Sequence, residues 1–402
     1  MPRPSSLALL AALSLAAPAQ TYHPTPVDAS RFPILAWGSS PSDAPSLALM
    51  KEAGLNLSGF CRPENLDAVR DAGLSCIVTG TPLNAMVDHP ETTGAQIRQA
   101  VDALAARIAN HPAAFGVYLR DEPGAAQMPM LGRLAAALRR AMPAKLPYVN
   151  LFPNYANRRQ LGTDSYEEYV RAYLNDIALP YVSWDNYSLT AGEMHPRFYD
   201  NLELVRKLSL EKGIPFWNCI LSTALFRHME PSDATLSLQV YATLAYGGRG
   251  IQYFTYFTVD QGNFRLAPID VYGNRTATWD ALRRINNQIH ALAPTILNLR
   301  STGVYHWPVS TAAGTPLLKD IRTSAQLLVG EFVDASGRPY VMLVNKSLTE
   351  SFSFTPEPWQ PGAVLRRISP ASGKEGPFGG EATWLAPGAG ILLRIAAPEP
   401  PK

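Results

Sequence analysis

The chain has 402 residues, of which 47% are hydrophobic and 17% are charged, as expected of a globular protein with a large buried core. Its 35 basic and 33 acidic residues give a formal net charge of +2, and no basic block is present. This balance argues against nucleic acid as a partner.

The first nineteen residues are expected to form a signal peptide. Arg3 supplies a short positive region, and residues 7–17 form an apolar run that is too short to span a bilayer. Residues 17–19 read Ala-Pro-Ala, a small-residue cleavage pattern, so the mature chain is expected to start near Gln20. The alternative is an uncleaved membrane anchor. Because no later apolar run is long enough to span a membrane, we expect a secreted or periplasmic protein.

Strand-like and helix-like runs then alternate as far as residue 297. Helical periodicity marks stretches such as residues 96–109 and 130–142. Eight runs have the character of strands: 33–38, 55–60, 75–80, 115–119, 147–151, 181–184, 215–219 and 251–257. Eight successive βα units predict an α/β fold, a (β/α)8 TIM barrel over residues 20–297.

The chain changes character near residue 298. Pro, Gly, Ser and Thr become frequent, and helical periodicity disappears. Short strand-like runs remain at residues 325–332, 340–345, 351–354, 363–368 and 391–395. This pattern predicts a small C-terminal antiparallel β-sandwich over residues 298–398.

The three cysteines, Cys61, Cys76 and Cys219, do not form a dense disulfide pattern. Free buried thiols are expected, and a Cys61–Cys76 bridge between neighbouring strands is the alternative. The sequence has no CxxC pair and no HExxH motif, and its histidines lack ligand spacing. No metal site and no organic cofactor are therefore expected.

The most informative stretch is AFGVYLRDEP at residues 114–123. A short strand runs directly into Asp121 and Glu122. Because strand residues alternate between two faces, Arg120 and Glu122 are expected to share the face of Tyr118. An acid at the C-terminal end of a barrel strand indicates a proton donor in a pocket. The alternative is a helix start, where carboxylates and a proline at the first position are also favoured.

The other strand ends carry aromatic and amide side chains. This composition suits a sugar, because aromatic rings stack on pyranose faces and amides bind hydroxyl groups. Asp185 ends the sixth strand on the face that holds Ser183, which makes it a second candidate catalytic carboxylate, with a turn-capping aspartate as the alternative. The candidate substrate-binding residues are Asp121, Arg120, Asn150, Tyr187, Trp217, Asn218 and Tyr256. The aromatic ones have core packing as their alternative role.

With these features the chain resembles clan A glycoside hydrolases. In that clan the fourth strand ends Asn-Glu-Pro, and the glutamate is the general acid/base. Asp121-Glu122-Pro123 occupies this place. Residues 111–123 and 241–250 also resemble secreted bacterial glycosidase-like proteins. The resemblance implies that Glu122 protonates the leaving oxygen, that Asp121 replaces the amide that binds the 2-hydroxyl, and that the pocket raises the pKa of Glu122.

The seventh strand departs from the pattern of the clan. The clan places its nucleophile, a glutamate, at the end of that strand, whereas residues 216–221 contain no carboxylate. Asp185 is the expected second carboxylate, with Glu230 or a Cys219 nucleophile as alternatives. Since strands four and six are not neighbours, Asp185 is expected across the pocket from Glu122. That placement leaves room for a water molecule and favours inversion.

The sequence therefore predicts a secreted glycoside hydrolase that cleaves a poly- or oligosaccharide, with Glu122 as general acid. One alternative is a non-catalytic carbohydrate-binding protein on a barrel that lacks the strand-seven nucleophile. The other is a structural, envelope-associated module. A binding protein would show glycan affinity without product release, and a structural module would have a shallow, apolar top face that lacks converging polar groups.

Overall fold

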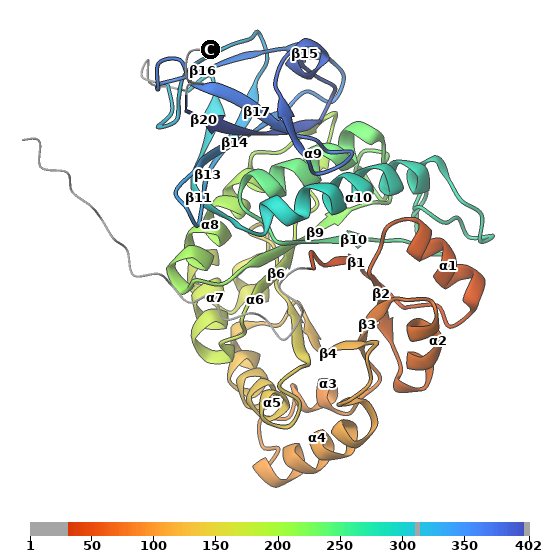
Figure 1. The fold of residues 1–402 in the computed structure, drawn as a ribbon. Coiled ribbons are helices and arrows are strands. Elements are labelled where there is room, and N and C mark those ends of the chain that lie inside the picture. Colours follow the sequence, from red (N-terminus) through yellow and green to blue (C-terminus); the bar gives the residue numbers. More distant parts are fainter. Residues whose placement is uncertain (1–30, 310–313, 398–402) are drawn as a thin grey trace, which may run out of the picture.

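The computed structural model describes residues 31–309 and 314–397, so the expected signal peptide lies outside the described residues. An eight-stranded parallel sheet curls into a barrel with helices on its outside, and antiparallel sheets follow it (Figure 1). The predicted fold class, a TIM barrel followed by a C-terminal β-sandwich, is confirmed.

The eight barrel strands coincide with the eight predicted runs to within a few residues. Their order around the barrel is β5-β4-β3-β2-β1-β10-β9-β6. At the seam, Leu151 pairs with Trp184, and the Leu151 N–H donates to the Ser183 carbonyl at 2.8 Å. The strands are β1 (Ile34–Ala36), β2 (Leu57–Cys61), β3 (Ser75–Val78), β4 (Ala114–Asp121), β5 (Leu146–Asn150), β6 (Val182–Asp185), β9 (Phe216–Leu221) and β10 (Gly250–Phe254).

The longer outer helices bury an apolar face, whereas α9 is buried almost all round because the C-terminal sheet also contacts it. In α4 this face is Ile97, Val101, Leu104 and Ile108, and a Thr93–Gln96 capping box fixes the start of the helix. The helices are α1 (Ala44–Glu52), α2 (Leu66–Asp71), α3 (Leu83–Met86), α4 (Gly94–Ile108), α5 (Met128–Ala141), α6 (Arg158–Leu161), α7 (Tyr166–Ala172), α8 (Arg197–Lys212), α9 (Asp233–Ala245) and α10 (Ala277–Ile296). Short helical turns are η1 (Pro63–Asn65), η2 (Ala125–Gln127), η3 (Tyr173–Ile177) and η4 (Gly380–Thr383). No helix within the described ranges has the length and apolar content to cross a membrane.

The C-terminal region is built on a six-stranded sheet of order β11-β13-β14-β20-β17-β18. Its strands are β11 (Leu299–Trp307), β13 (Leu327–Asp334), β14 (Pro339–Asn345), β17 (Val364–Ile368), β18 (Glu375–Pro377) and β20 (Gly390–Ala396). Shorter pairs complete it: β12 (Leu318–Arg322) with β16 (Thr355–Pro358), and β15 (Phe352–Ser353) with β19 (Trp384–Leu385). A small hairpin, β7 (Leu189–Thr190) with β8 (Glu193–Met194), lies in the loop after β6.

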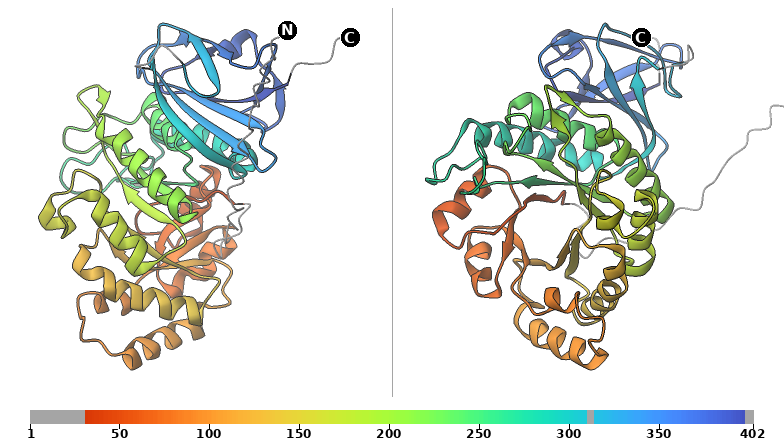
Figure 2. Two further views of the ribbon diagram at one scale, coloured as in Figure 1. Left: turned by 90° about the vertical axis from the view of Figure 1, so that its left-hand side faces the viewer. Right: turned by 180° about the vertical axis from the view of Figure 1, so that it is seen from behind.

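The C-terminal sheet packs against the wall of the barrel at α9. Figures 1 and 2 show it beside the barrel and not over the barrel's end. Leu328, Phe332 and Met342 of the sheet belong to the same hydrophobic core as the barrel. The approach is close, since a Cβ on Gly330 would lie 2.2 Å from the carbonyl oxygen of Ala245 in α9. The barrel and the sheet are therefore joined by a continuous core.

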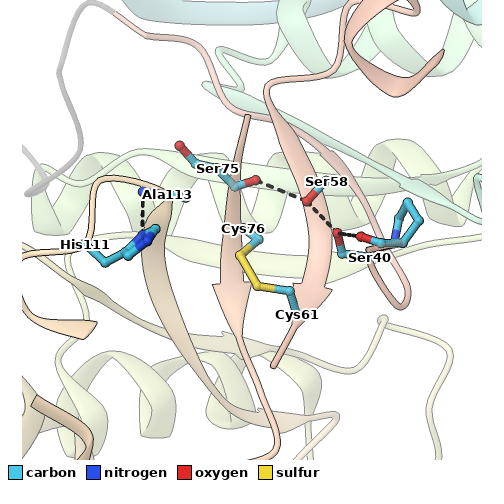
Figure 3. The surroundings of a disulfide bond; sticks show 8 residues. Ser40, Ser58, Cys61, Ser75, Cys76, His111 and Ala113 are labelled. Atoms are coloured by element: carbon cyan, nitrogen blue, oxygen red, sulfur yellow. Dashed lines mark hydrogen bonds between the residues drawn. A yellow bond between two sulfur atoms is a disulfide. The ribbon is translucent and has the colours of Figure 1, made fainter. Parts of the chain in front are cut away.

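Cys61 of β2 and Cys76 of β3 form a disulfide (Figure 3). The expectation of free thiols is therefore wrong for this pair. The two residues are not direct neighbours in the ladder, since Cys61 lies opposite Val78, but their Cα atoms are 6.2 Å apart, within the range of a disulfide. Cys219 is a free, buried thiol, as expected.

Candidate active site

Asp121, Asn150 and Asp185 meet at the C-terminal ends of three strands, β4, β5 and β6. The Asn150 Nδ2 donates to Asp121 Oδ1 at 3.1 Å and to Asp185 Oδ1 at 2.9 Å, so these two carboxylate oxygens lie within 6.0 Å of each other. Only β5 separates the two aspartates. Asp185 therefore lies beside Asp121, and its placement across the pocket from Glu122 stays a prediction.

A buried chain of hydrogen bonds fixes the orientation of the Asn150 amide. The Ser183 hydroxyl donates to Asn150 Oδ1 at 2.7 Å, and Gln252 Nε2 donates to the Ser183 Oγ at 2.7 Å. The Tyr148 hydroxyl in turn donates to Gln252 Oε1. All of these side chains are buried. Because its oxygen is held by Ser183, the amide can present only its NH2 group to the two aspartates.

A β-bulge in β4 decides which of its polar side chains faces the barrel interior. Tyr118 lies opposite Tyr148, but Arg120 lies opposite Val149 and Asp121 opposite Asn150, so the register shifts by one residue. The shift breaks the alternation that the sequence predicted. Asp121 faces inward.

Arg120 is directed away from the cluster by the same shift. Its guanidinium forms an ion pair with Asp88 and donates to Asn84 Oδ1 of α3 at 3.3 Å. The structure does not bring Arg120 to the carboxyl groups.

Glu122 follows the bulge in an unusual backbone conformation. Its φ is +46°, a left-handed value that is strained for a residue with a Cβ. Its N–H donates to the Asn150 carbonyl at 2.8 Å, which anchors this conformation to β5. Burial and the charge of Asp121 raise the pKa of Glu122 to about 7. Strained backbone around an acid whose pKa is raised to near neutrality is typical of a functional position.

The two aspartates are also weaker acids than usual. Burial raises the pKa of Asp121 to about 6, against the opposing effect of the Asn150 hydrogen bond. Burial, and then the charges of Glu122 and Asp121, raise the pKa of Asp185 well above its ordinary value. The ionisation of Glu122 therefore opposes that of Asp185. At neutral pH the three carboxyl groups cannot all be charged.

Cys219 lies on the inner face of β9, a strand that contains no carboxylate. It lies opposite Asp185 in the ladder, and its Sγ is 3.6 Å from the Tyr187 hydroxyl. Burial and the charge of Asp185 raise the pKa of the Cys219 thiol well above its ordinary value. Such a thiol stays protonated, so the alternative of a Cys219 nucleophile finds no support.

Glu230 does not join the cluster either. Its side chain is 62% exposed, and its Oε1 lies 3.4 Å from Arg265 Nε. The alternative in which Glu230 folds back over the pocket is therefore not supported.

Three other predicted site residues lie away from the carboxyl groups. Trp217 lies deeper in the barrel, with its ring 4.7 Å from that of Tyr181. Asn218 points out of the barrel, and its Nδ2 donates to Thr243 Oγ1 of α9 at 2.9 Å. Tyr256 is buried and accepts a hydrogen bond from Trp279 Nε1 of α10 at 3.0 Å. Strand alternation and depth in the barrel place these side chains in the core.

Tyr187 does reach the site, where it joins a pocket of about 280 Å³. Its ring stacks on Phe254 at 5.2 Å, and its N–H donates to the Tyr155 hydroxyl at 3.2 Å. The pocket is lined by Tyr155, Tyr187, Ser188, Thr190, His195, Arg197 and His228. The sequence did not indicate the two histidines and the arginine as site residues, because His195 and His228 lie in loops, Arg197 begins α8, and the three have no regular spacing.

Comparison with known proteins shows what the chain resembles in structure. A GH42 β-galactosidase from G. stearothermophilus, solved as a catalytic mutant, has a TM-score of 0.59 at 10% identity, over 91% of this chain and 98% of that chain. A glycoside hydrolase family 5 protein from Bacteroides vulgatus has a TM-score of 0.56 at 12% identity, over 91% and 89%. A β-galactosidase from the psychrophilic Marinomonas ef1 has a TM-score of 0.49 at 12% identity, over 66% of this chain and 62% of that chain. This chain therefore spans less than two thirds of that β-galactosidase.

The resemblance is one of fold. No family model matches the chain, and no curated protein matches it in sequence. At 10–12% identity the first two structures show that the chain has the barrel fold found among glycoside hydrolases. The resemblance expected from the sequence is confirmed at this level.

Proposed function

We propose that this protein is a glycoside hydrolase that acts on an oligo- or polysaccharide, with Glu122 as the general acid and Asp185 as the second carboxylate. One observation carries the proposal: three carboxyl groups of raised pKa meet at the C-terminal ends of the barrel strands, beside a pocket. Active sites of barrel enzymes lie at this end. The glycoside hydrolases of the same fold support the proposal by analogy.

The role of Glu122 follows from its environment. Because its pKa is raised to about 7, a large fraction of the side chain is protonated at neutral pH. A donor whose pKa lies near the working pH is effective in general acid catalysis. Glu122 would protonate the glycosidic oxygen as the bond to the anomeric carbon breaks.

Asp121 and Asp185 would act as a pair. Two full charges within 6.0 Å in a buried site repel each other, so the pair holds about one negative charge at neutral pH. That charge would stabilise the positive charge that develops on the sugar ring. When it resides on Asp185, this carboxylate can accept a proton from an attacking water molecule.

The experiment is to assay wild-type protein, Glu122→Gln, Asp185→Asn and Glu230→Gln against a broad panel of glycans. Product release by the wild type should fall about 100-fold or more in the first two variants, the usual range for loss of a general acid or base. Glu230→Gln is the matched control, because it removes an exposed carboxylate outside the cluster. Turnover by Glu122→Gln at the wild-type rate would refute the assignment.

One observation favours a second candidate function. The inner face of β9 carries Cys219 and no carboxylate, which suits a carbohydrate-binding protein on an inactive barrel. Glycan binding by the wild type without product release across the same panel would identify that function.

We also propose that the protein is exported. The Cys61–Cys76 disulfide supports this, because disulfides persist in oxidising compartments. Expression of the full chain in a bacterium should yield a periplasmic or extracellular protein whose first residue, by N-terminal sequencing, lies near Gln20. An unprocessed protein in the cytoplasm would contradict it.

A further inference from the structure

We propose that the pocket beside the carboxyl cluster binds the anionic group of an acidic sugar, either the carboxylate of a hexuronic acid or a sulfate ester. This inference rests on the proposed function and specifies the class of its substrate. The pocket is formed by loops after β5, β6 and β9 and has a volume of about 280 Å³. That volume is close to the lower limit of ligand pockets, about 300 Å³, so it suits a single sugar residue.

The pocket is contiguous with the carboxyl cluster through two tyrosines. Tyr155 and Tyr187 line it, and the Tyr155 hydroxyl accepts the Tyr187 N–H. The Tyr187 hydroxyl lies 3.6 Å from Cys219 Sγ, and Cys219 lies opposite Asp185 in the ladder, so the pocket adjoins the carboxyl cluster. Tyr155 is 40% exposed and offers a ring face to a sugar. A glycan whose scissile bond lies at Glu122 would therefore place a neighbouring residue in the pocket.

Arg197 is the main cationic group of the pocket. It opens α8 with its side chain exposed. No ion pair holds its guanidinium among residues 31–309 and 314–397, whereas Arg120, beside the cluster, is paired with Asp88. A guanidinium without an internal partner is suited to bidentate contact with a carboxylate or sulfate.

Backbone groups hold the two histidines of the pocket lining. The His195 Nδ1 lies 3.2 Å from the Arg197 backbone N and accepts its N–H, so the ring of His195 is fixed beside Arg197. The His228 Nδ1 lies 2.8 Å from Leu225 O and its Nε2 lies 3.0 Å from Tyr187 O, so this ring ties the loop after β9 to Tyr187. Arg197 therefore remains the group that would contact an anion.

The charge of this pocket is opposite to that of its surroundings. Of the described residues that line it, none is acidic, whereas Cys219, which contacts the Tyr187 hydroxyl, lies opposite Asp185, and Asn150 joins Asp185 to Asp121. A neutral sugar gains little binding free energy from this arrangement of charges. An acidic sugar would form an ion pair with Arg197 in the pocket while its scissile bond lies at the carboxyl cluster. We infer that the pocket discriminates in favour of anionic residues.

The test is binding by calorimetry, which needs no turnover. The probes are oligosaccharides of four to six residues in three groups: hexuronides (oligogalacturonate, oligoglucuronate, oligomannuronate), sulfated galactans and neutral counterparts (galactan, glucan, mannan). Each is titrated at low salt into wild-type protein and into Glu122→Gln, which prevents cleavage. Arg197→Gln is compared with Arg159→Gln, an exposed arginine of α6 outside the pocket lining. Unfolding temperatures of all variants exclude loss of fold.

Wild-type protein should bind at least one set of acidic oligosaccharides about tenfold or more tightly than the neutral counterpart, as expected for a charge-assisted hydrogen-bonded pair. Arg197→Gln should lose about tenfold in affinity for that probe, and Arg159→Gln should match the wild type. A hexuronide preference identifies a carboxylate, and a galactan sulfate preference identifies a sulfate ester. Equal binding of the neutral probes, no binding of any acidic probe, or unchanged affinity in Arg197→Gln would overturn the inference.

This outcome is distinguishable from that of the proposed function. Hydrolysis of neutral glycans that needs Glu122 and is unaffected by Arg197→Gln would leave the hydrolase standing and refute the acidic-sugar pocket. Tight binding of an acidic glycan without product release would support the acidic-sugar pocket and refute the hydrolase.

Discussion

Replacement of Asp121 by Asn should stabilise the protein at neutral and alkaline pH. Burial raises the pKa of Asp121 to about 6, whereas its ordinary value is 3.8. A carboxyl whose pKa is raised by folding binds its proton more tightly in the folded state. Its contribution is fully favourable below pH 4 and is lost as the pH rises through about 6. Above about pH 6 the folded wild type must therefore ionise the Asp121 carboxyl in a buried site, which costs more free energy than ionising it in the unfolded chain.

The size of the effect follows from the change in the pKa of Asp121. A rise in pKa of about two corresponds to a free energy of about 3 kcal/mol, since a tenfold change in the ionisation equilibrium corresponds to about 1.4 kcal/mol. The side chain keeps partial solvent access, so we expect Asp121→Asn to raise the free energy of unfolding by about 1–3 kcal/mol at pH 8. The isosteric amide cannot ionise, and it also removes a negative charge beside Glu122 and Asp185.

The assay is urea or thermal unfolding of wild type and variant between pH 4 and pH 8. The two proteins should be equally stable near pH 4, and the variant should gain steadily above pH 5. Glu230→Gln, which removes an exposed carboxylate, should follow the wild type at every pH. An Asp121→Asn variant that is less stable than the wild type at pH 8, or that differs by the same amount at both ends of the range, would refute the electrostatic argument.

Two further predictions concern packing and the buried hydrogen bonds. Ser183→Ala removes the donor to Asn150 Oδ1 and the acceptor of Gln252 Nε2, so it should lower the free energy of unfolding by about 1–3 kcal/mol and lower turnover by freeing the Asn150 amide. Ser209→Ala is the control, because the buried Ser209 hydroxyl has no hydrogen-bond partner within the described structure. Equal effects of the two substitutions would contradict the role of Ser183. Gly330→Ala places a Cβ 2.2 Å from the Ala245 carbonyl and should cost about 1–3 kcal/mol in chemical unfolding. Gly376→Ala, with nothing within 4 Å of its added Cβ, should be close to neutral, and a harmless Gly330→Ala would show that the sheet does not pack tightly on α9.

The sequence predicted the elements of the fold because their signals are local. All eight barrel strands were placed to within a few residues, and both predicted helices correspond to α4 and α5. In the second region β11, β12, β16, β18 and β19 were missed, because the register of β11 breaks between Ser301 and Gly303 and the other four strands have five residues or fewer. Periodicity finds regular segments and overlooks irregular ones.

The carboxyl cluster was partly visible in the sequence. The alternation on β6 correctly places Tyr181, Ser183 and Asp185 on one face, which meets Val149, Asn150 and Gln252 in the barrel. The same reasoning failed on β4, where the bulge between Tyr118 and Arg120 exchanges Arg120 for Asp121 on the inner face. A bulge arises from the way two strands pair, so it cannot be predicted from the sequence of one strand.

Local sequence patterns specify the chemistry that the chain carries: eight βα units, an Asp-Glu-Pro at the end of the fourth strand and a lone aspartate at the end of the sixth. Which of these groups meet depends on the folded chain. Folding joins Cys61 to Cys76, places Asn150 between two aspartates, and brings Arg197, His195 and His228 together around one pocket. The two kinds of information act over different ranges. Propensity and periodicity act over a few residues, whereas strand register, burial and the approach of charges depend on contacts between residues far apart in the chain.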